Sequence, residues 1–438
     1  MNRRTVLATA VAAALLVLPA CTSTGGTSKG ADAKAADDPS KVSGTIKVLT
    51  VRTDLVQDGT MDKYAAEFNK VYPKVKVEFE GLTNYEAEVK IRMNTENYGD
   101  VLLIPAVIKK DDYPKFFASL GTVEERSEKY RFTDFTSVDG KVYGQSPNGV
   151  MPGFLYNKRV WSQAGVTAWP TTPAEFIDAL KAIKEKTDAV PYYTNFAAGW
   201  TLSGWTAVNG AVHCDPQATT KLAEGNPWAE GADLRVGDTL LHDIVHEGLA
   251  EKDPTTSNWE ASKPQLAKGE IATQWLGTWA IIQFQDAARK AGTNPDDIGF
   301  MPFPAQTNGT FCSTVGPDYN QGINVHSKNK EAARAWLDWF TDKSGYDKDN
   351  LAISPLKDAP MPEVLQPYED AGVELIELDD SKGAQVKLID AESEVGINTP
   401  DYRQDLVDLA RGARKGSLDD FLDELGKKWT DTQKTVGS

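Results

Sequence analysis

The sequence has few residues of the kinds that build metal sites and reactive thiol sites. Three of its 438 residues are cysteines and four are histidines. It has no CxxC pair and no GxxxxGK[ST] phosphate loop, so neither a cysteine-held metal nor a P-loop nucleotide site is indicated. His242 and His246 stand four apart, but no H-E-x-x-H glutamate lies between them. We interpret both as part of a solvated helix face and predict no metal and no cofactor.

Positive charge is also scarce. The chain has 47 lysines and arginines against 63 aspartates and glutamates, which gives a formal net charge of −16 at pH 7. A field of this sign repels phosphate backbones and anionic lipid surfaces, so we predict no nucleic-acid partner and no binding of the folded body to the membrane surface. Beyond the first twenty residues, no apolar run approaches the ~20 residues that a membrane span requires.

The N-terminus does carry an apolar run, at residues 6–18, behind the basic pair Arg3 and Arg4. This pattern is typical of a secretory signal, so we predict that residues 1–20 form a signal peptide. The Leu-Pro-Ala-Cys stretch that ends at Cys21 resembles a bacterial lipobox, which implies acylation of Cys21 and a lipid anchor on the outer face of the cytoplasmic membrane. An ordinary secretory signal beside a chance cysteine is the alternative. The arginine pair leaves the export route, general secretory or twin-arginine, open.

Residues 21–43 are rich in Gly, Ser, Thr, Ala, Asp and Lys and contain almost no large apolar side chain. Such a segment buries too little surface to offset its ordering entropy, so we predict a flexible linker between the lipid anchor and the folded body. With Cys21 assigned to lipid, Cys214 and Cys312 remain. In an oxidising compartment these two can form a disulfide, although the sequence alone does not place them within bonding distance.

From residue 44 onward, strands and helices alternate. Short β-rich segments predict strands at 45–51, 75–79 and 101–104, and apolar residues at helical spacing predict helices at 61–71 and 85–93 between them. This alternation is typical of an α/β unit with a parallel sheet. Further helices are predicted at 173–186, 234–246, 278–290, 330–341, 402–414 and 418–432.

Two sets of short motifs follow one another along this α/β body. The first comprises Asp139-Gly140-Lys141-Val142-Tyr143-Gly144, Phe154-Leu155-Tyr156-Asn157-Lys158, Ala164-Gly165-Val166, Trp169-Pro170-Thr171-Thr172-Pro173 and Glu175-Phe176. The second comprises Gly248-Leu249, Trp259, Leu266-Ala267-Lys268-Gly269-Glu270-Ile271-Ala272, Leu276-Gly277-Thr278-Trp279, Ile298-Gly299-Phe300-Met301-Pro302-Phe303-Pro304, Gly322-Ile323-Asn324-Val325 and Ser327-Lys328-Asn329. Near the C-terminus, Ala410-Arg411-Gly412, Leu418 and Phe421-Leu422 complete the order. The ordered set resembles the extracellular solute-binding proteins of the maltose-binding type over nearly all of residues 44–438.

The resemblance implies a type II periplasmic-binding-protein-like fold, with two α/β lobes, a multi-strand hinge and a ligand cleft between the lobes. The implied N-terminal lobe comprises residues 44–149 and 324–372, and the implied C-terminal lobe comprises residues 150–323 and 373–438. Hinge strands are expected near 150–153 and 321–323, with a third crossing after residue 372. Closure of such lobes around a ligand is a hinge motion, and open α/β sheets bind ligands outside the carboxyl ends of their strands.

The chain has 11 tryptophans, which is many for so acidic a protein. Flat aromatic rings suit the C–H faces of sugars, while carboxylates and amides pair with sugar hydroxyls. Trp279 lies in the stretch that the resembled family places at its cleft. Core packing is the alternative for each tryptophan, and a solvated loop position is the alternative for the other candidates. The further predicted ligand contacts are Trp275, Trp200, Trp205, Tyr193, Tyr85, Asp54, Asp100, Asp318 and Tyr319.

The resemblance implies a substrate-binding lipoprotein of an ABC importer, with a mono- or oligosaccharide as the expected ligand. Such a protein captures its solute outside the cell, closes around it and delivers it to membrane permease subunits, and it catalyses nothing. One alternative is a lipid-anchored hydrolase of extracellular glycans, because 63 acidic residues offer many carboxylate pairs. Another alternative keeps the binding role with a non-sugar solute.

Overall fold

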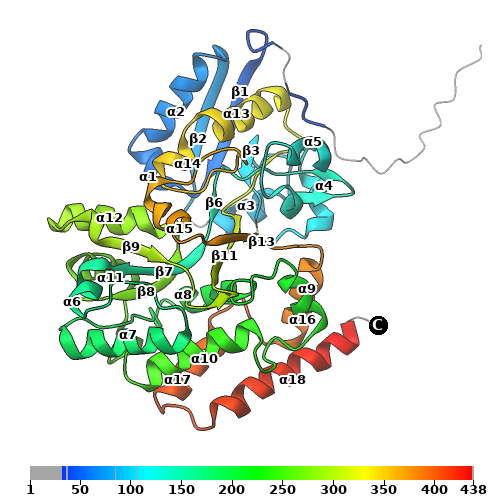
Figure 1. Ribbon diagram of the computed structural model, residues 1–438. Helices are drawn as coiled ribbons and strands as arrows, with labels where there is room; N and C mark the ends of the chain where they lie inside the picture. The colour runs from blue at the N-terminus through cyan, green and yellow to red at the C-terminus, as the bar shows by residue number, and fades with distance from the viewer. Residues whose placement is uncertain (1–31, 36–37, 84, 106, 437–438) are drawn as a thin grey trace, which may run out of the picture.

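The alternating segment near the N-terminus of the body builds the first sheet. In the computed structural model, which describes residues 32–35, 38–83, 85–105 and 107–436, β1 (Ser43–Thr50) pairs in parallel with β2 (Lys74–Gly81) and β3 (Val101–Leu103). β12 (Gln321–Ile323) comes from far along the chain and pairs antiparallel with β3, so the strand order is β12-β3-β1-β2. This sheet is the centre of the N-terminal lobe, at the top of Figure 1.

Amphipathic helices cover this sheet with their apolar sides. Phe68 on α2 and Trp336 on α13 pack edge to face with ring centroids 5.3 Å apart, and both belong to one buried cluster with strand residues such as Ile46. The helices of this lobe are α1 (Thr53–Gln57), α2 (Thr60–Asn69), α3 (Tyr85–Arg92), α4 (Tyr113–Phe116), α5 (Val123–Ser127), α13 (Lys330–Lys343) and α14 (Tyr346–Asp349).

The C-terminal lobe is built on a second, antiparallel sheet of order β8-β7-β9, with β7 (Pro152–Asn157) at its centre between β8 (Thr273–Gly277) and β9 (Ile298–Met301). All residues of β8 and β9 are buried, because helices enclose this sheet. The helices of this lobe are α6 (Lys158–Gln163), α7 (Pro173–Lys186), α8 (Trp200–Ser203), α9 (Ala218–Glu224), α10 (Asp233–His246), α11 (Trp259–Lys268), α12 (Ala280–Ala291), α16 (Gly383–Ser393), α17 (Asp401–Ala410) and α18 (Leu418–Val436).

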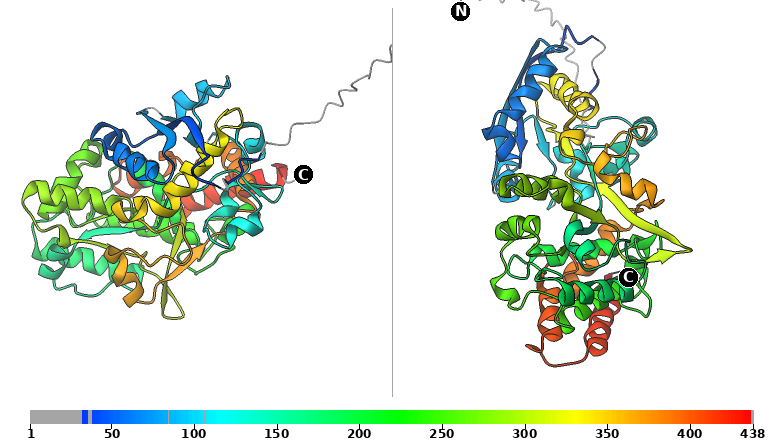
Figure 2. Two further views of the ribbon diagram at one scale, coloured as in Figure 1. Left: turned by 90° about the horizontal axis from the view of Figure 1, so that it is seen from above. Right: turned by 60° about the vertical axis from the view of Figure 1, so that its left-hand side comes forward.

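A third, small sheet lies between the two lobes (Figures 1 and 2). Its central strand β11 (Thr310–Pro317) pairs in parallel with β13 (Glu374–Glu377), antiparallel with β6 (Gly149–Val150), and in a hairpin with β10 (Gln306–Thr307). Since the chain passes between the lobes along these strands, we call them the hinge sheet. The remaining elements are the hairpin β4 (Ser137–Val138) and β5 (Lys141–Val142), and α15 (Gln366–Asp370).

One of the expected hinge strands takes a different position. Residues 321–323 form β12, which is buried in the N-terminal sheet and not part of the hinge sheet. Gly322 allows this close packing, because a Cβ atom there would lie 2.6 Å from the Phe117 ring. The crossing from the C-terminal to the N-terminal lobe therefore occurs just before β12, between β11 and residue 321. The exact lobe boundaries stay a prediction.

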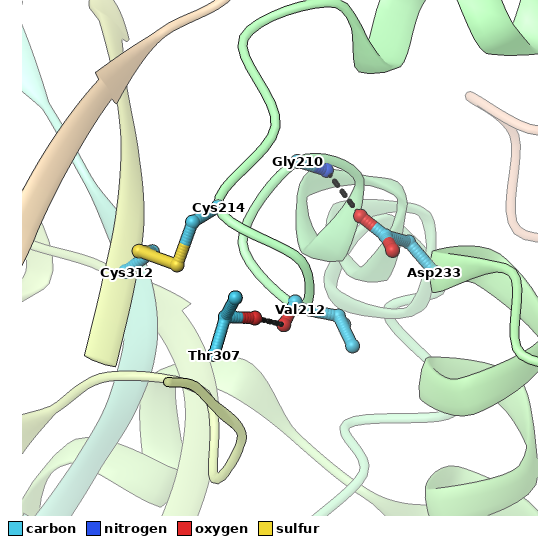
Figure 3. The surroundings of a disulfide bond; sticks show 6 residues. All are labelled: Gly210, Val212, Cys214, Asp233, Thr307 and Cys312. Carbon is cyan, nitrogen blue, oxygen red and sulfur yellow. Dashed lines mark hydrogen bonds between the residues drawn. A yellow bond between two sulfur atoms is a disulfide. The ribbon is translucent and has the colours of Figure 1, made fainter. Parts of the chain in front are cut away.

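A disulfide between Cys214 and Cys312 ties the hinge sheet to the C-terminal lobe (Figure 3). Cys312 lies on β11, Cys214 lies in the loop before α9, and their Cα atoms are 5.4 Å apart. Beside the disulfide, Thr307 Oγ1 donates a hydrogen bond of 3.1 Å to the carbonyl oxygen of Val212. In the chain-entropy model, a cross-link over 98 residues removes on the order of 4–5 kcal/mol of unfolded-state entropy.

Candidate functional site

A cleft of about 1160 Å³ opens between the two lobes. It is lined by the loop after β1 and by α14 from the N-terminal lobe, by one face each of α11 and α12 from the C-terminal lobe, and by the crossing segments beside the hinge sheet. Common small-molecule sites have volumes of about 300–1,000 Å³, so this cleft has room for a ligand of several rings.

The C-terminal lobe presents an aromatic wall that consists of Trp200, Trp259 and Trp279. Trp259 is the first residue of α11 and Trp279 is the N-cap of α12, so both rings lie where a helix begins at the cleft. Their centroids are 5.9 Å apart. Trp200 opens α8, is 42% exposed, and has its ring 5.0 Å from Trp259 and 5.7 Å from Trp279. The three rings therefore form one continuous apolar surface.

The N-terminal lobe presents a charged wall that consists of Arg52, Asp54, Tyr346 and Asn350. Arg52 donates from Nε and Nη2 to the two carboxylate oxygens of Asp54, at 2.9 and 2.7 Å. Its Nη1 donates to Asn350 Oδ1 at 2.6 Å and to the Tyr346 hydroxyl at 3.3 Å. This two-pronged geometry fixes the plane of the carboxylate as well as its position.

The charges on this wall stabilise one another. The hydrogen bonds from Arg52 hold the pKa of Asp54 below its usual value. Burial alone would lower the pKa of Arg52, but the hydrogen bonds and charge of Asp54 outweigh burial, and the pKa of Arg52 is raised. Both side chains therefore stay ionised at neutral pH, and the free lone pairs of Asp54 can accept hydrogen bonds from a ligand.

Between the two walls lies a hinge floor that consists of Asn148, Asp318 and Gln321. Asn148 precedes β6, Asp318 follows β11 and Gln321 opens β12, so all three belong to the crossing segments. The Asp318 backbone N–H donates to the Asn148 carbonyl oxygen at 3.1 Å, and the Asn148 side chain lies beside the Asp318 carboxylate. Solvent reaches Asp318 through the cleft, but protein surrounds it on the other sides, and this desolvation raises the pKa of Asp318.

Four of the predicted ligand contacts line the cleft: Trp279, Asp54, Asp318 and Tyr319. They come from both lobes and from the hinge. Tyr319 is 37% exposed and lies beside the hinge floor. Trp200 does not line the cleft itself, but it extends the aromatic wall at its edge.

Trp275 and Trp205 lie in the core of the C-terminal lobe, so we remove them from the set of ligand contacts. Their rings are 5.3 Å apart and are 3% and 1% exposed. Trp275 Nε1 donates to the Gly204 carbonyl oxygen at 3.0 Å, which satisfies its only polar group. The physical reason is the position of Trp275 in β8, where helices cover both faces of the sheet and no side chain points to solvent.

Tyr85, Asp100 and Tyr193 are also held away from the cleft lining by hydrogen bonds within the fold. The Tyr85 hydroxyl bonds both backbone groups of Leu103, at 2.7 and 3.0 Å, and is buried. The Asp100 carboxylate accepts from Lys47 N at 2.8 Å and from the Ser327 hydroxyl at 2.5 Å. The Tyr193 hydroxyl accepts from Asn258 N at 2.8 Å and thereby supports the segment that begins α11.

Several cleft residues escaped the sequence prediction, among them Trp259, Arg52 and Asn148. Trp259 stands in one of the family motifs and directly follows the helix-capping residue Asn258, and this position could have indicated a side chain at the cleft. Arg52 directly follows the first strand, as Asp54 does, and the same strand-end argument applies to it. Asn148 had no local signal, because only the crossing of the lobes brings it beside Asp318.

The remaining sequence predictions concern the linker, lipid and metal. In the predicted linker 21–43, Ala33 is buried and its N–H donates to the Ser119 carbonyl oxygen at 2.9 Å, so this part of the segment packs on the N-terminal lobe. Cys21 and residues 1–20 lie outside the described residues. Within the described residues, no helix combines the length and apolar content needed to cross a bilayer, and no three His, Cys, Asp or Glu side chains gather in a way that could hold a metal ion. His242 and His246 stack with centroids 5.3 Å apart on α10, and His246 Nδ1 lies 3.3 Å from the Ala410 carbonyl oxygen.

Comparison with known proteins identifies the family. The family model of bacterial extracellular solute-binding proteins matches residues 53–347. The protein belongs to this family. Among curated members, this solute-binding protein is 30% identical over 359 residues to the diacetylchitobiose-binding protein DasA of Streptomyces coelicolor, which covers 77% of each chain. It is 22% identical over 313 residues to the multiple sugar-binding protein of Streptococcus mutans, which covers 68% of this chain and 72% of that protein.

Solved structures of this family share the fold. A binding protein of an ABC transporter from Bifidobacterium animalis subsp. lactis, in complex with mannobiose, is 32% identical with a TM-score of 0.82 and covers 94% of this chain and 100% of that one. A manno-oligosaccharide-specific solute-binding protein of the same organism, in complex with mannotriose, has the same identity and TM-score and covers 93% and 99%. The predicted fold of two α/β lobes around a cleft is thereby confirmed, as is the predicted family.

Proposed function

We propose that this solute-binding protein captures an oligosaccharide outside the cell and delivers it to the permease of an ABC importer. The observation that carries the proposal is the arrangement of the cleft, where an aromatic wall faces a charged wall across a polar floor. A sugar has C–H faces that pack on aromatic rings and hydroxyls that pair with carboxylates and amides. The relatives that bind mannobiose, mannotriose and diacetylchitobiose support this ligand class.

A ligand screen tests the sugar assignment. Thermal melts of the purified protein with mannobiose, mannotriose, diacetylchitobiose and raffinose are compared with melts in amino acids and short peptides. A sugar at 100 times its dissociation constant adds about 2.7 kcal/mol to the free energy of unfolding, so a true ligand raises the melting temperature clearly. Stabilisation by a peptide or an amino acid, and by none of the saccharides, would contradict the proposal.

Lobe closure is the mechanical part of the proposed function. The chain crosses between the lobes at the hinge sheet, so ligand bound to both walls should draw the lobes together. We expect the radius of gyration from small-angle scattering to fall when the ligand found in the screen is added. An identical scattering curve at saturating ligand would indicate a rigid binder instead.

The lipid anchor at Cys21 is part of the same proposal, since a tethered binding protein stays near its permease. Two acyl chains hold a protein stably at a bilayer, because each buried methylene contributes ~0.8 kcal/mol. We expect Cys21→Ala to move the protein from the membrane fraction to the medium or to leave it unprocessed. Normal processing with unchanged membrane retention would refute the anchor without affecting the sugar assignment.

The proposed role includes no catalysis. The family members named above are described as binding proteins. Prolonged incubation of the purified protein with mannotriose or diacetylchitobiose should therefore release no new reducing ends. If the wild-type protein does release reducing ends, and Asp54→Asn or Asp318→Asn abolishes this release, the protein would instead be a glycan hydrolase.

A further inference from the structure

The hinge floor, made of Asn148, Asp318 and Gln321, offers hydrogen-bond acceptors that nothing in the fold satisfies. Asn148 Oδ1 and Gln321 Oε1 are buried, and neither has a hydrogen-bond partner among the described residues. The side chains are 4% and 7% exposed, and both line the cleft. Buried polar groups are nearly always paired, so an unpaired one at the wall of a cleft indicates a bond that a ligand completes.

Asn148 and Asp318 are joined through the backbone, because the Asp318 N–H donates to the Asn148 carbonyl oxygen at 3.1 Å. In the Asn148 side-chain amide, the oxygen is the buried atom that lacks a partner among the described residues. The floor therefore holds the Asn148 oxygen and the Asp318 carboxylate side by side, and both accept hydrogen bonds.

The charge of Asp318 is not balanced locally. Asp54, on the charged wall, is held by two hydrogen bonds from Arg52. Among the described residues no cation forms an ion pair with Asp318, and Arg52 acts on it only through space. Tyr319 and Tyr346, the other titratable groups that interact with it, are also neutral at pH 7. The floor thus carries a net negative charge on a carboxylate that faces the open cleft and that no neighbouring cation in the described part of the chain neutralises.

We propose that the hinge floor selects the charge of the sugar unit that it binds. It accepts neutral or amino sugars, whose hydroxyls or ammonium group donate hydrogen bonds to Asn148 and Asp318. It excludes sugar units that bear a carboxylate, sulfate or phosphate, because such a group brings a second negative charge to Asp318 and no donor for the unpaired oxygens. This inference rests on the proposed oligosaccharide-binding function, and it adds the charge class of the sugars that bind.

The test compares two ligands in matched variants by titration calorimetry. The probes are mannotriose, or diacetylchitobiose if the screen shows that it binds more tightly, and the same sugar oxidised at its primary alcohols to uronate. Wild-type protein should bind the neutral probe at least about 100-fold more tightly than the uronate. Asp318→Asn keeps the shape of the side chain. In this variant the affinity for the neutral probe should fall about tenfold, and the preference for the neutral probe over the uronate should shrink by at least tenfold.

Two further variants separate local selection from general charge. Asp286→Asn removes another carboxylate that lines the cleft, but one that is paired with Arg289 at 2.5 Å, so the preference should stay as in the wild type. Asn148→Ala removes the unpaired acceptor but leaves the charge of Asp318. The affinity for the neutral probe should therefore fall, while the uronate should still not bind. Repeating the titrations in 0.5 M salt removes long-range repulsion by the acidic surface.

The outcomes distinguish this inference from the function on which it rests. If no saccharide binds the wild-type protein, the proposed function fails and the selection fails with it. If neutral saccharides bind but the preference is the same in Asp318→Asn as in the wild type, the function stands and the selection is overturned. Equal loss of preference in Asp286→Asn and Asp318→Asn also overturns it, because general electrostatics would then explain the discrimination.

Discussion

The two walls of the cleft differ in how their side chains are held. The aromatic wall has few hydrogen bonds, and its three rings are placed by packing where α8, α11 and α12 begin. The charged wall is a hydrogen-bonded network in which Arg52 joins the loop after β1 to Asn350, which lies 298 residues later in the chain. Contact area dominates the first wall, and the geometry of donors and acceptors dominates the second.

This difference suggests a division of work. Ring surface binds any sugar that presents a C–H face, so the aromatic wall should set how tightly ligands bind. Hydrogen bonds are directional and leave an unpaired buried group when the ligand does not match, so the charged wall and the hinge floor should set which ligands bind. The predictions below test this division, and they run from the largest expected effect to the smallest.

The largest loss of affinity is expected for Trp279→Ala. Truncation removes the desolvated contact area of a ring on the cleft wall and should cost roughly 2–4 kcal/mol of binding, the range for an aromatic hot spot. Because each 1.4 kcal/mol is about a tenfold change, the dissociation constant should rise some thirtyfold or more. Titration calorimetry measures this loss, which should be similar for all saccharides that bind.

Trp275→Ala is the matched control for that variant. Trp275 lies only four residues away but is buried in the core, so its truncation should lower the free energy of unfolding by about 3–5 kcal/mol and leave the affinity of the folded fraction unchanged. Denaturant melts on both variants separate the two effects. A large stability loss with unchanged affinity in Trp279→Ala would assign Trp279 to the core and weaken the carbohydrate assignment.

The next effect is expected on the charged wall. Arg52→Gln removes both hydrogen bonds that orient Asp54 and the bond to Asn350, so affinity should fall by roughly 1–3 kcal/mol. Arg52→Lys keeps the charge but cannot hold both carboxylate oxygens, so it should restore little of the loss. In contrast to Trp279→Ala, the loss should differ between mannotriose and diacetylchitobiose. Equal losses of affinity for both sugars would show that this wall sets how tightly ligands bind and not which ligands bind.

The same contrast explains how much the sequence predicted. Periodicity located the first three strands and eight of the helices within a few residues, because their buried faces repeat at regular spacing. Trp279 was predicted from its place in a family motif and Asp318 from its place before an expected hinge strand, and both line the cleft. Pattern at this level was sufficient for the family and for α12, the helix that Trp279 caps.

The errors came from side chains whose environment depends on distant segments. Trp275 was predicted because, together with Trp279, it flanks the family motif at 276–278, but helices cover both sides of its strand. Asp100 stands at a strand end, yet its carboxylate bonds Ser327, which lies 227 residues later. The Asn148–Asp318 pair joins residues 170 positions apart in the same way. Contacts of this kind leave no local pattern in a sequence.

A smaller effect is expected when the pH is lowered. In the proposed complex, ligand hydroxyls donate to the ionised Asp318 carboxylate. The pKa of Asp318 is raised by desolvation above the usual value of 3.8, whereas the pKa of Asp54 is lowered by Arg52. As pH falls through the pKa of Asp318, affinity should therefore drop first by about 1–1.5 kcal/mol, roughly tenfold, while Asp54 is still ionised. Calorimetry as a function of pH measures this step.

Linkage separates this step from unfolding. A carboxyl group whose pKa is raised in the folded state binds more protons folded than unfolded, so Asp318 contributes added stability as pH falls through this window. Affinity and the Asp318 contribution to stability should thus move in opposite directions. In Asp318→Asn the affinity step should disappear. An unchanged step in that variant would assign the pH dependence to another group.

The smallest effect is expected for Trp200→Ala at the edge of the aromatic wall. Trp200 is 42% exposed and does not line the cleft, and it touches the wall through its contacts with Trp259 and Trp279. Loss of an aromatic pair of this kind costs about 1 kcal/mol, so affinity should fall only about fivefold. Trp200→Phe keeps an aromatic ring and should therefore retain most of the affinity that Trp200→Ala loses. If Trp200→Ala instead weakens binding as strongly as Trp279→Ala, the ligand reaches Trp200 on closure, and the aromatic wall extends beyond the cleft seen in this structure.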